Sequence, residues 1–275
     1  MPGNAPTLRD GQGASANGAE SNWSLRRTGL GHTGHGADAD DCSKVQDPGR
    51  EGDRRPRAIT CWRVVVQPGG SPLDSMSWLF SFEGLDGVGK STQVDLTRDW
   101  LEGQGYRVRV IREPGGTDLG EKIRDLLLYQ SQHRDARAEF LLFAAARAEL
   151  VRTVVVPFLA VEGAVVLADR YVDSSEAYQG AGLGVDLGLI HTVNRSVCQS
   201  VWPQGTLWLD GVRRTDGSAH DVIEARPRDF FDRVRLGYQT LADREPKRVV
   251  RINGDQDPEQ VFAEVVRSLR AWLHC

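Results

Sequence analysis

The sequence predicts an α/β fold in which helices cover both faces of a parallel sheet. From Met76 onward, short apolar runs of strand length alternate with longer amphipathic stretches, a pattern typical of strand–helix–strand units. A glycine-rich segment, residues 84–89, separates the first strand from the first helix. Because ligands of such folds bind beyond the carboxyl ends of the strands, the residues that follow each strand are the first candidates for a site.

Five strands and six helices are expected after Met76. The expected strands are Trp78–Phe82, Arg107–Ile111, Ala164–Ala168, Thr206–Leu209 and Arg248–Ile252. The expected helices are Ser91–Glu102, Gly120–Leu128, Glu139–Leu159, Asp186–Gln199 and Arg228–Ala242, with a last one that begins at Pro258. Asp257 before Pro258 supports that start, since a capping side chain followed by proline is typical of a helix N-terminus.

Residues 84–91 match the phosphate-binding motif G-x-x-x-x-G-K-[ST] at every defined position. Glycines let successive N–H groups turn toward an anion, and the positive end of the following helix points to the same place. Lys90 would reach the β- and γ-phosphates of a nucleotide and Ser91 would bind Mg²⁺. A chance glycine-rich turn is the alternative, and the flanking strand and helix count against it. The predicted ATP-binding residues are Gly84, Leu85, Asp86, Gly87, Val88, Gly89, Lys90, Ser91 and Thr92.

The motif narrows the fold to a P-loop NTPase, a three-layer sandwich with a five-stranded parallel sheet flanked by helices. The apolar strand Ala164–Ala168 ends in Asp169 and Arg170. A carboxylate in this place holds Mg²⁺, so Ser91 and Asp169 are the predicted metal ligands. Arg170 would direct its planar set of donors at phosphate oxygens. A structural ion pair at the strand end is the alternative for Asp169 and Arg170.

Three longer strings occur in the order and spacing of a known family. They are Arg-Glu-Pro-Gly-Gly-Thr at 112–117, Leu-Phe-Ala-Ala-Ala-Arg at 142–147, and Asp-Arg-Tyr-Val-Asp-Ser-Ser-Glu-Ala-Tyr-Gln-Gly at 169–180. With the P-loop, they make residues 77–273 resemble bacterial thymidylate kinases. The resemblance implies transfer of the γ-phosphate of ATP to dTMP with Mg²⁺ as cofactor, and it implies a homodimer.

The resemblance also implies a role for individual residues of the acceptor site. Phe143 would stack on the thymine ring and Arg147, four residues later on one helix face, would bond a base carbonyl. Ser175 and Gln179 would meet the polar edge of the base, and Tyr178 would crowd the 2′ position of the sugar. The predicted dTMP-binding residues are Glu113, Pro114, Arg124, Phe143, Arg147, Arg170, Ser175, Tyr178 and Gln179.

Other interpretations of these residues stay open at this point. Phe143 would also suit a buried helix face, and Arg124 and Arg147 would also suit solvated helix surfaces. The resemblance also implies that Asp86, inside the P-loop, would bind the 3′-hydroxyl of the sugar or lie near the acceptor phosphate, and that Arg170 would bridge the donor and acceptor phosphates.

The predicted lid is short and departs from the family pattern. In this family a further arginine comes from the P-loop or from a mobile lid, and the P-loop here carries Gly87 at the variable position. Arg213 and Arg214 are therefore the predicted lid residues of the catalytic set, with Arg226 as a weaker candidate. The other predicted catalytic residues are Lys90, Arg170 and Asp86. The usual D-R-[IF]-E string appears as Asp-Val-Ile-Glu at 221–224, without its arginine. A weakly active nucleotide-binding homologue and a deoxynucleoside kinase are the alternative functions.

Residues 1–75 differ from the rest of the chain. They contain 12 of the 30 glycines, with nine acidic and nine basic side chains and few large apolar residues. Such a segment buries too little apolar surface to offset the entropy of ordering it, so we expect a disordered extension. The second methionine, Met76, directly precedes the first strand and is the expected native start. Residues 76–275 would then form the kinase-like domain.

Composition argues against several other classes of protein. The formal net charge of −4 and pI near 5.9 give no reason to expect a nucleic-acid partner. No apolar run reaches the roughly 18 residues that a membrane-spanning helix needs. The four cysteines, Cys42, Cys61, Cys198 and Cys275, show no metal or redox spacing and suit free thiols in a reducing compartment. We expect a cytoplasmic protein.

Overall fold

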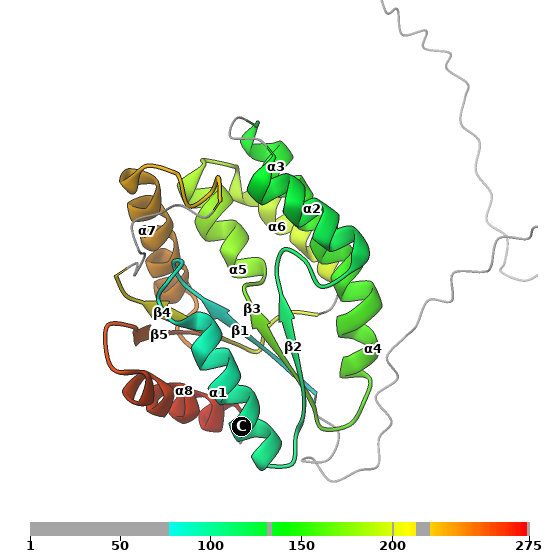
Figure 1. Ribbon diagram of the computed structural model, residues 1–275, viewed down its shortest axis with the longest axis vertical. Helices are drawn as coiled ribbons and strands as arrows, with labels where there is room; N and C mark the ends of the chain where they lie inside the picture. The colour runs from blue at the N-terminus through cyan, green and yellow to red at the C-terminus, as the bar shows by residue number, and fades with distance from the viewer. Residues whose placement is uncertain (1–76, 131–133, 200, 213–220, 274–275) are drawn as a thin grey trace, which may run out of the picture. The chain divides into compact units, whose positions relative to one another are not determined.

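The computed structural model describes residues 77–130, 134–199, 201–212 and 221–273. Its core is a five-stranded sheet with the strand order β2-β3-β1-β4-β5, in which all neighbours are parallel (Figure 1). The predicted α/β fold is confirmed. The predicted disordered extension, residues 1–75, and the predicted start at Met76 lie outside the described residues.

The five strands lie within one or two residues of their predicted positions. They are β1 (Trp78–Glu83), β2 (Arg107–Arg112), β3 (Ala164–Asp169), β4 (Gly205–Asp210) and β5 (Val249–Asn253). The helices of six or more residues are α1 (Lys90–Gly103), α2 (Asp118–Tyr129), α3 (Ala136–Leu150), η2 (Ser175–Gly182), α6 (Leu187–Cys198), α7 (Arg228–Arg244) and α8 (Pro258–Leu273). None of the described helices is long and apolar enough to span a bilayer.

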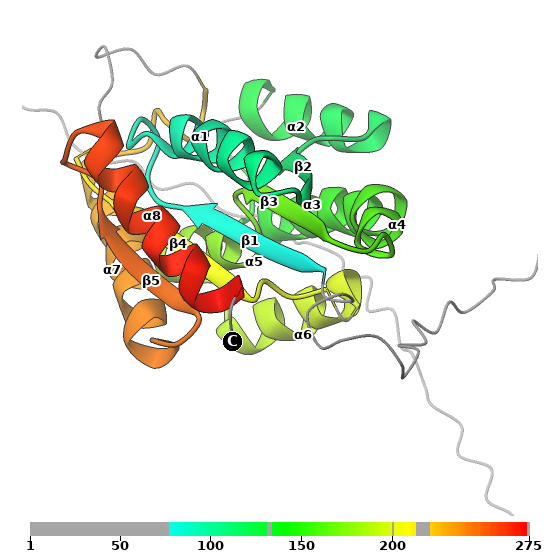
Figure 2. The same ribbon diagram turned by 90° about the horizontal axis from the view of Figure 1, so that it is seen from below.

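Strand β1 is buried along its whole length because both faces of the sheet are covered. Phe80 and Phe82 point into a core shared with α1 and α8, which pack side by side (Figures 1 and 2). Leu79 points to the opposite face, into a core with Leu150 and Val151. The alternation of side chains along the strand therefore fills two cores, and the apolar run predicted from the sequence is explained.

The predicted helix Glu139–Leu159 is present but is not a uniform α-helix. Its α-helical part, α3, continues into a π-helical segment, η1 (Val151–Val155), and then into the short α4 (Val156–Leu159). Pro157 has no N–H to donate and its ring crowds the carbonyl four residues earlier, so a wider turn before it relieves the conflict.

One helical segment was not predicted. Residues Val172–Ser174 (α5) and the π-helical η2 follow Arg170 directly. They contain serines and glycines, which favour helices weakly, and η2 is stabilised by packing against α7. This segment carries three of the predicted acceptor-site residues, Ser175, Tyr178 and Gln179.

Candidate active site

The carboxyl ends of β1, β2 and β3 meet at one edge of the sheet. The strand register places Phe82 and Arg112 beside Asp169, so the residues that follow each strand become neighbours. Two adjoining cavities open at this edge. The first, called the P-loop cavity, is lined by Asp86, Gly87, Gly89, Lys90, Ser91, Thr92, Arg112, Glu113, Arg124, Asp169, Arg170 and Glu224.

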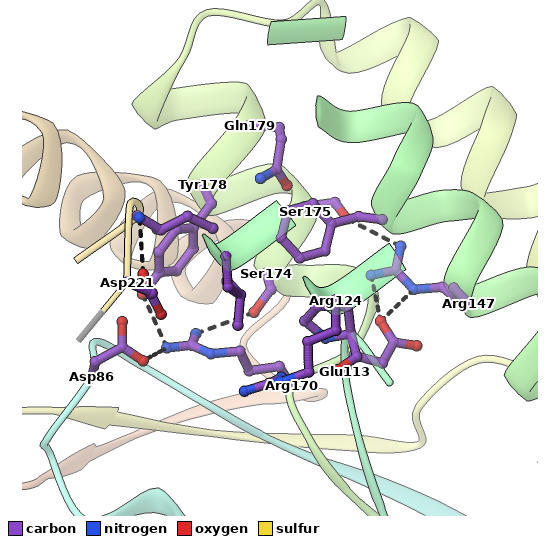
Figure 3. A pocket seen from close by; sticks show the side chains of 14 residues that line it. Asp86, Glu113, Arg124, Arg147, Arg170, Ser174, Ser175, Tyr178, Gln179 and Asp221 are labelled. Atoms are coloured by element: carbon purple, nitrogen blue, oxygen red, sulfur yellow. Dashed lines mark hydrogen bonds and ion pairs between the residues drawn. The ribbon is translucent and has the colours of Figure 1, made fainter. Parts of the chain in front are cut away.

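The second cavity lies between the P-loop and the helices α2, α3 and η2 and is called the side cavity (Figure 3). It is lined by Asp86, Glu113, Pro114, Arg124, Leu128, Phe143, Arg147, Arg170, Ser174, Ser175, Tyr178, Gln179, Asp221 and Ile223. Four residues line both cavities: Asp86, Glu113, Arg124 and Arg170.

Backbone geometry explains the glycines of the P-loop. Gly84 has a φ of +133°, and a Cβ there would lie 2.3 Å from the carbonyl oxygen of Leu209. Gly89, with a φ of +93°, precedes α1 in a left-handed conformation and, among the described residues, no side chain caps the helix. The first N–H groups of α1 are therefore available to an anion, which is the arrangement that binds phosphate.

The Lys90 side chain is buried against its own loop. Its Nζ donates a hydrogen bond of 2.8 Å to the carbonyl oxygen of Leu85 and lies 3.8 Å from Asp86. Burial, and then the Arg170 cation, lower the pKa of Lys90 to about 8, although the Asp86 and Asp169 carboxylates oppose the shift. A bound polyphosphate would raise this pKa again, because its negative charge favours the protonated amine. Lys90 is therefore suited to bind an anionic ligand.

Ser91 and Asp169 come together as predicted. The Ser91 hydroxyl donates to Asp169 Oδ2 at 2.8 Å, and both side chains line the P-loop cavity. A hydroxyl and a carboxylate are the hard oxygen ligands that Mg²⁺ prefers, so this pair fits the ion chemically.

Arg170 has an unusual backbone conformation. Its φ of +71° lies in the left-handed region, which costs a non-glycine residue on the order of 1 kcal/mol or more. Two hydrogen bonds hold it there: the Arg170 N–H donates to Phe82 O at 3.1 Å, and the Tyr171 N–H donates to Glu83 Oε1 at 2.8 Å. The reversal directs the side chain away from the strand and toward both cavities.

The Arg170 guanidinium is held at the junction of the two cavities. One terminal nitrogen donates to Asp86 Oδ1 at 2.6 Å and to Tyr178 Oη at 3.0 Å (Figure 3). The guanidinium carbon lies 4.8 Å from the centre of the Tyr178 ring. The P-loop, β3 and η2 thus combine to place one cation where two phosphate groups can meet.

Arg147 is the centre of a buried hydrogen-bond network at the far side of the side cavity, and only 1% of its side chain is exposed. Its Nε donates to Glu113 Oε2 at 2.8 Å. One terminal nitrogen donates to Ser175 Oγ at 3.0 Å and to Asn194 Oδ1 at 2.7 Å. The other lies 2.6 Å from Glu113 Oε2 and donates to the Tyr171 carbonyl oxygen at 3.2 Å. The guanidinium therefore makes four hydrogen bonds and a close ion-pair contact with protein acceptors.

The carboxylate paired with Arg147 has one unused oxygen. Glu113 is buried and lines both cavities, yet its Oε1 accepts no hydrogen bond from the described residues. Burial raises the pKa of Glu113, while the Arg147 cation opposes that shift. A buried oxygen of this kind favours a ligand or water that can donate to it.

Comparisons with known proteins identify the family of this chain. A family model described as thymidylate kinase matches residues 82–265. A thymidylate kinase from Kosmotoga olearia is 45% identical over 193 residues, which is 68% of this chain and 92% of that protein. The chain belongs to the thymidylate kinase family. The thymidylate kinase of Clavibacter sepedonicus is 46% identical over 192 residues, covering 67% of this chain and 90% of that protein.

A solved structure gives the same result for the fold. The crystal structure of thymidylate kinase from Ehrlichia chaffeensis superposes with a TM-score of 0.61 at 35% sequence identity. The match covers 70% of this chain and 98% of that one.

The structure brings together most residues that were assigned from the thymidylate kinase resemblance. All nine predicted dTMP-binding residues line the side cavity, although Arg147 would have to exchange one of its present hydrogen bonds to contact a base. Six predicted ATP-binding residues line the P-loop cavity: Asp86, Gly87, Gly89, Lys90, Ser91 and Thr92. The Val88 side chain faces the core instead. Gly84 and Leu85 shape the loop through their backbones.

The predicted lid of this thymidylate kinase family member is only partly visible. Arg213 and Arg214 lie outside the described residues. The weaker candidate, Arg226, forms a salt bridge with the buried Glu139 and lies over the Phe230 ring. Its charge is therefore directed to a carboxylate that also accepts a hydrogen bond from Gln179. Glu224, from the altered D-R-[IF]-E string, lines the P-loop cavity.

Sequence reasoning missed several residues around the site. Ser174 and Asp221 line the side cavity although no role was assigned to them, and both lie inside strings that had been singled out. Arg112 lines the P-loop cavity from the start of the 112–117 string. Glu83 and Tyr238 were missed as well. Tyr238 lies within hydrogen-bond distance of Arg170 and donates to Glu83, which also accepts from the Tyr171 N–H. In the sequence, only the position of Glu83 directly before the P-loop could have pointed to it.

Proposed function

We propose that this protein transfers the γ-phosphate of ATP to dTMP. An oxygen of the dTMP phosphate forms a bond to the γ-phosphorus, the bond from that phosphorus to the β–γ bridging oxygen breaks, and ADP and dTDP are released. The observation that carries the proposal is the place of Arg170, which lines both the P-loop cavity and the side cavity. A cation there can contact the donor and acceptor phosphates at the same time.

The side cavity suits a pyrimidine deoxynucleoside monophosphate. Phe143 provides an aromatic wall for the base, and Arg124 and Arg170 provide cations for the phosphate. Because Ser175 Oγ accepts a hydrogen bond from Arg147, its own proton is available to donate to a base carbonyl. Tyr178 would limit the space beside the 2′ carbon, and Asp86 would meet the 3′-hydroxyl or the acceptor phosphate.

The transfer itself needs alignment and charge stabilisation more than acid–base chemistry. The phosphate of dTMP is anionic at neutral pH, so no strong general base is required. Lys90 would stabilise the β- and γ-phosphates and Arg170 the transferred group, while the first turn of α1 directs its N–H groups at the same oxygens. Arg213 and Arg214 are proposed to close over this charge.

Ser91 and Asp169 would hold Mg²⁺ bound to ATP. When bound, the ion would neutralise charge on the β- and γ-oxygens. ATP and dTMP are therefore the proposed partners, and neither nucleic acid nor a membrane is part of the proposal.

We also infer a homodimer in the cytoplasm. Support for a dimer comes from large apolar side chains left exposed on adjacent helices: Leu119, Leu126 and Tyr129 on α2 and Leu141 on α3. An apolar surface of this kind is typical of a face covered by a partner. Light scattering after size exclusion would test it, and a monomer at micromolar concentration would refute it.

The proposed reaction is tested by comparing acceptors. An ADP-release assay with dTMP, dUMP, dCMP and thymidine should give the highest kcat/KM with dTMP, and Lys90→Ala should abolish turnover. Faster phosphorylation of thymidine would instead identify a deoxynucleoside kinase. Tight binding of ATP and dTMP with negligible dTDP formation would identify a weakly active homologue.

A further inference from the structure

Glu83, the last residue of β1, is a fully buried carboxylate that the proposed reaction does not use directly. No part of it is exposed to solvent, and it lies beneath Arg170 at the carboxyl edge of the sheet. Burying an ionisable group in this way is unfavourable unless hydrogen bonds satisfy it. Its partners therefore indicate what it does.

Four protein groups donate to the Glu83 carboxylate. Oε1 accepts from Ser81 Oγ at 2.7 Å and from the Tyr171 N–H at 2.8 Å. Oε2 accepts from Ser174 Oγ at 2.6 Å and from Tyr238 Oη at 2.8 Å. These four bonds use the carboxylate as an acceptor on both oxygens. They connect β1, the turn after β3, α5 and α7 at a single point.

The two hydroxyls on Oε2 also contact the guanidinium of Arg170. One of its terminal nitrogens donates to Ser174 Oγ at 3.4 Å and lies 3.5 Å from Tyr238 Oη. A hydroxyl has one proton, and the hydrogen bonds to the Glu83 carboxylate use the proton of each, in preference to the 3.1 Å contact between Ser174 Oγ and Tyr238 Oη, in which either oxygen could donate. Both hydroxyls therefore present only lone pairs to Arg170, as a cation requires.

We propose that Glu83 is a positioning residue for Arg170. It orients the hydroxyls of Ser174 and Tyr238 as acceptors and fixes the backbone turn through the Tyr171 N–H. Asp86 and Tyr178 hold the other terminal nitrogen of the guanidinium, so Arg170 is held from two sides. This role rests on the proposed function, in which Arg170 joins the donor and acceptor phosphates.

Glu83→Gln tests the role with almost no change in shape. The Tyr171 N–H is a donor that cannot reverse, so the amide oxygen of glutamine must face it. The amide NH₂ must then face the two hydroxyls and donate to them. Since the hydroxyls can share only one proton across their own 3.1 Å contact, at least one proton turns toward the Arg170 cation. We expect kcat for dTMP to fall by about 10- to 100-fold, the range for a charged group that loses a hydrogen bond. The KM for ATP should change by less than about threefold, because Lys90 and the P-loop are untouched.

A double-mutant cycle separates this role from a general loss of structure. The paired variant Ser174→Ala with Tyr238→Phe removes both hydroxyls and should itself lower kcat. Adding Glu83→Gln to it should cost less than about threefold more, because the groups through which Glu83 acts are gone. Ser81→Ala, which removes a donor from the other oxygen, is the matched control and should keep kcat within about twofold. Melting temperature and ATP-binding stoichiometry confirm the folded fraction of each variant.

The outcomes distinguish the two proposals. Two outcomes with an active wild type refute only the role of Glu83 and leave the proposed function standing. In the first, Glu83→Gln keeps the wild-type kcat. In the second, Glu83→Gln lowers kcat equally in the wild type and in the paired hydroxyl variant. If Glu83→Gln does not fold, full kcat in the paired hydroxyl variant refutes it. A wild type that binds both nucleotides without making dTDP refutes the proposed function.

Discussion

Replacing Arg147 by methionine should lower the free energy of unfolding by about 3–5 kcal/mol, the usual cost of removing one partner from a buried ion pair. The side chain is 1% exposed and its partner Glu113 is 2% exposed, so solvent cannot replace the lost contacts. Methionine fills a similar volume but donates nothing to Glu113, Ser175, Asn194 or the Tyr171 carbonyl. For a domain of this size the loss corresponds to a melting temperature lower by roughly 6–20 °C.

Urea unfolding and scanning calorimetry would measure the effect. Arg152→Met is the matched control, because Arg152 lies five residues later, is 66% exposed and pairs with Glu149 at the surface; we expect a change within about 0.5 kcal/mol. The double variant Arg147→Met with Glu113→Gln should recover more than half of the loss, since it removes the uncompensated charge. A loss below about 1 kcal/mol in the single variant would refute the buried network.

The deficit of Arg147→Met should also depend on pH. Burial already raises the pKa of Glu113 above its ordinary value of 4.5, and loss of the Arg147 cation removes the main opposing effect. A carboxyl whose folded-state pKa is raised contributes stability that is fully present below 4.5 and is lost as the pH rises through the folded-state pKa. The variant should therefore be closer to wild type at pH 5 than at pH 8. An equal deficit at both pH values would contradict this reasoning.

Three further predictions concern the phosphate site. Since the pKa of Lys90 is about 8, ATP binding at pH 8 should take up roughly half a proton. Calorimetry in two buffers of different ionisation enthalpy would detect this uptake. Uptake that persists in Lys90→Met would contradict its assignment to Lys90. Gly84→Ala should abolish ATP binding, because the added Cβ would overlap a backbone carbonyl. Gly103→Ala is the control and should bind ATP normally, because there is open space around Gly103. Equal affinities of the two variants for ATP would contradict the loop geometry. Arg213→Ala with Arg214→Ala should lower kcat by about 10³ with a much smaller effect on KM, and full kcat in steady-state kinetics would show that the lid assignment is wrong.

The three central strands, β1, β3 and β4, could be predicted closely because each is buried almost along its whole length, whereas the edge strands β2 and β5 are partly exposed. A parallel strand in this position needs an unbroken apolar run, as in residues 164–168, and such runs stand out between helical patterns. The segment Val172–Gly182 could not be predicted in the same way. Its serines and glycines favour no regular structure, and contact with α7, which is distant in sequence, holds it as a helix.

The residue types of the site were also accessible from the sequence, but their partners were not. The strings at 112–117, 142–147 and 169–180 contain nine of the fourteen residues that line the side cavity. They did not show that Arg147 donates to several protein acceptors, because one of these, Asn194, lies 47 residues away on another helix. Tyr238, which meets Glu83 across 155 residues, belongs to no motif. Contacts of this range depend on the packing of helices against the sheet, which local patterns do not specify.

The most direct test of the proposed reaction is transfer of ³²P from γ-labelled ATP to dTMP, with dTDP separated from inorganic phosphate. We expect label in dTDP in a one-to-one ratio with ADP for the wild type. Arg170→Met should lower transfer by about 10³-fold or more, because it removes one of the two cations, with Arg124, that line both cavities. Label that appears only as inorganic phosphate, or an Arg170→Met variant that transfers at the wild-type rate, would contradict the proposal that the two cavities hold donor and acceptor around Arg170.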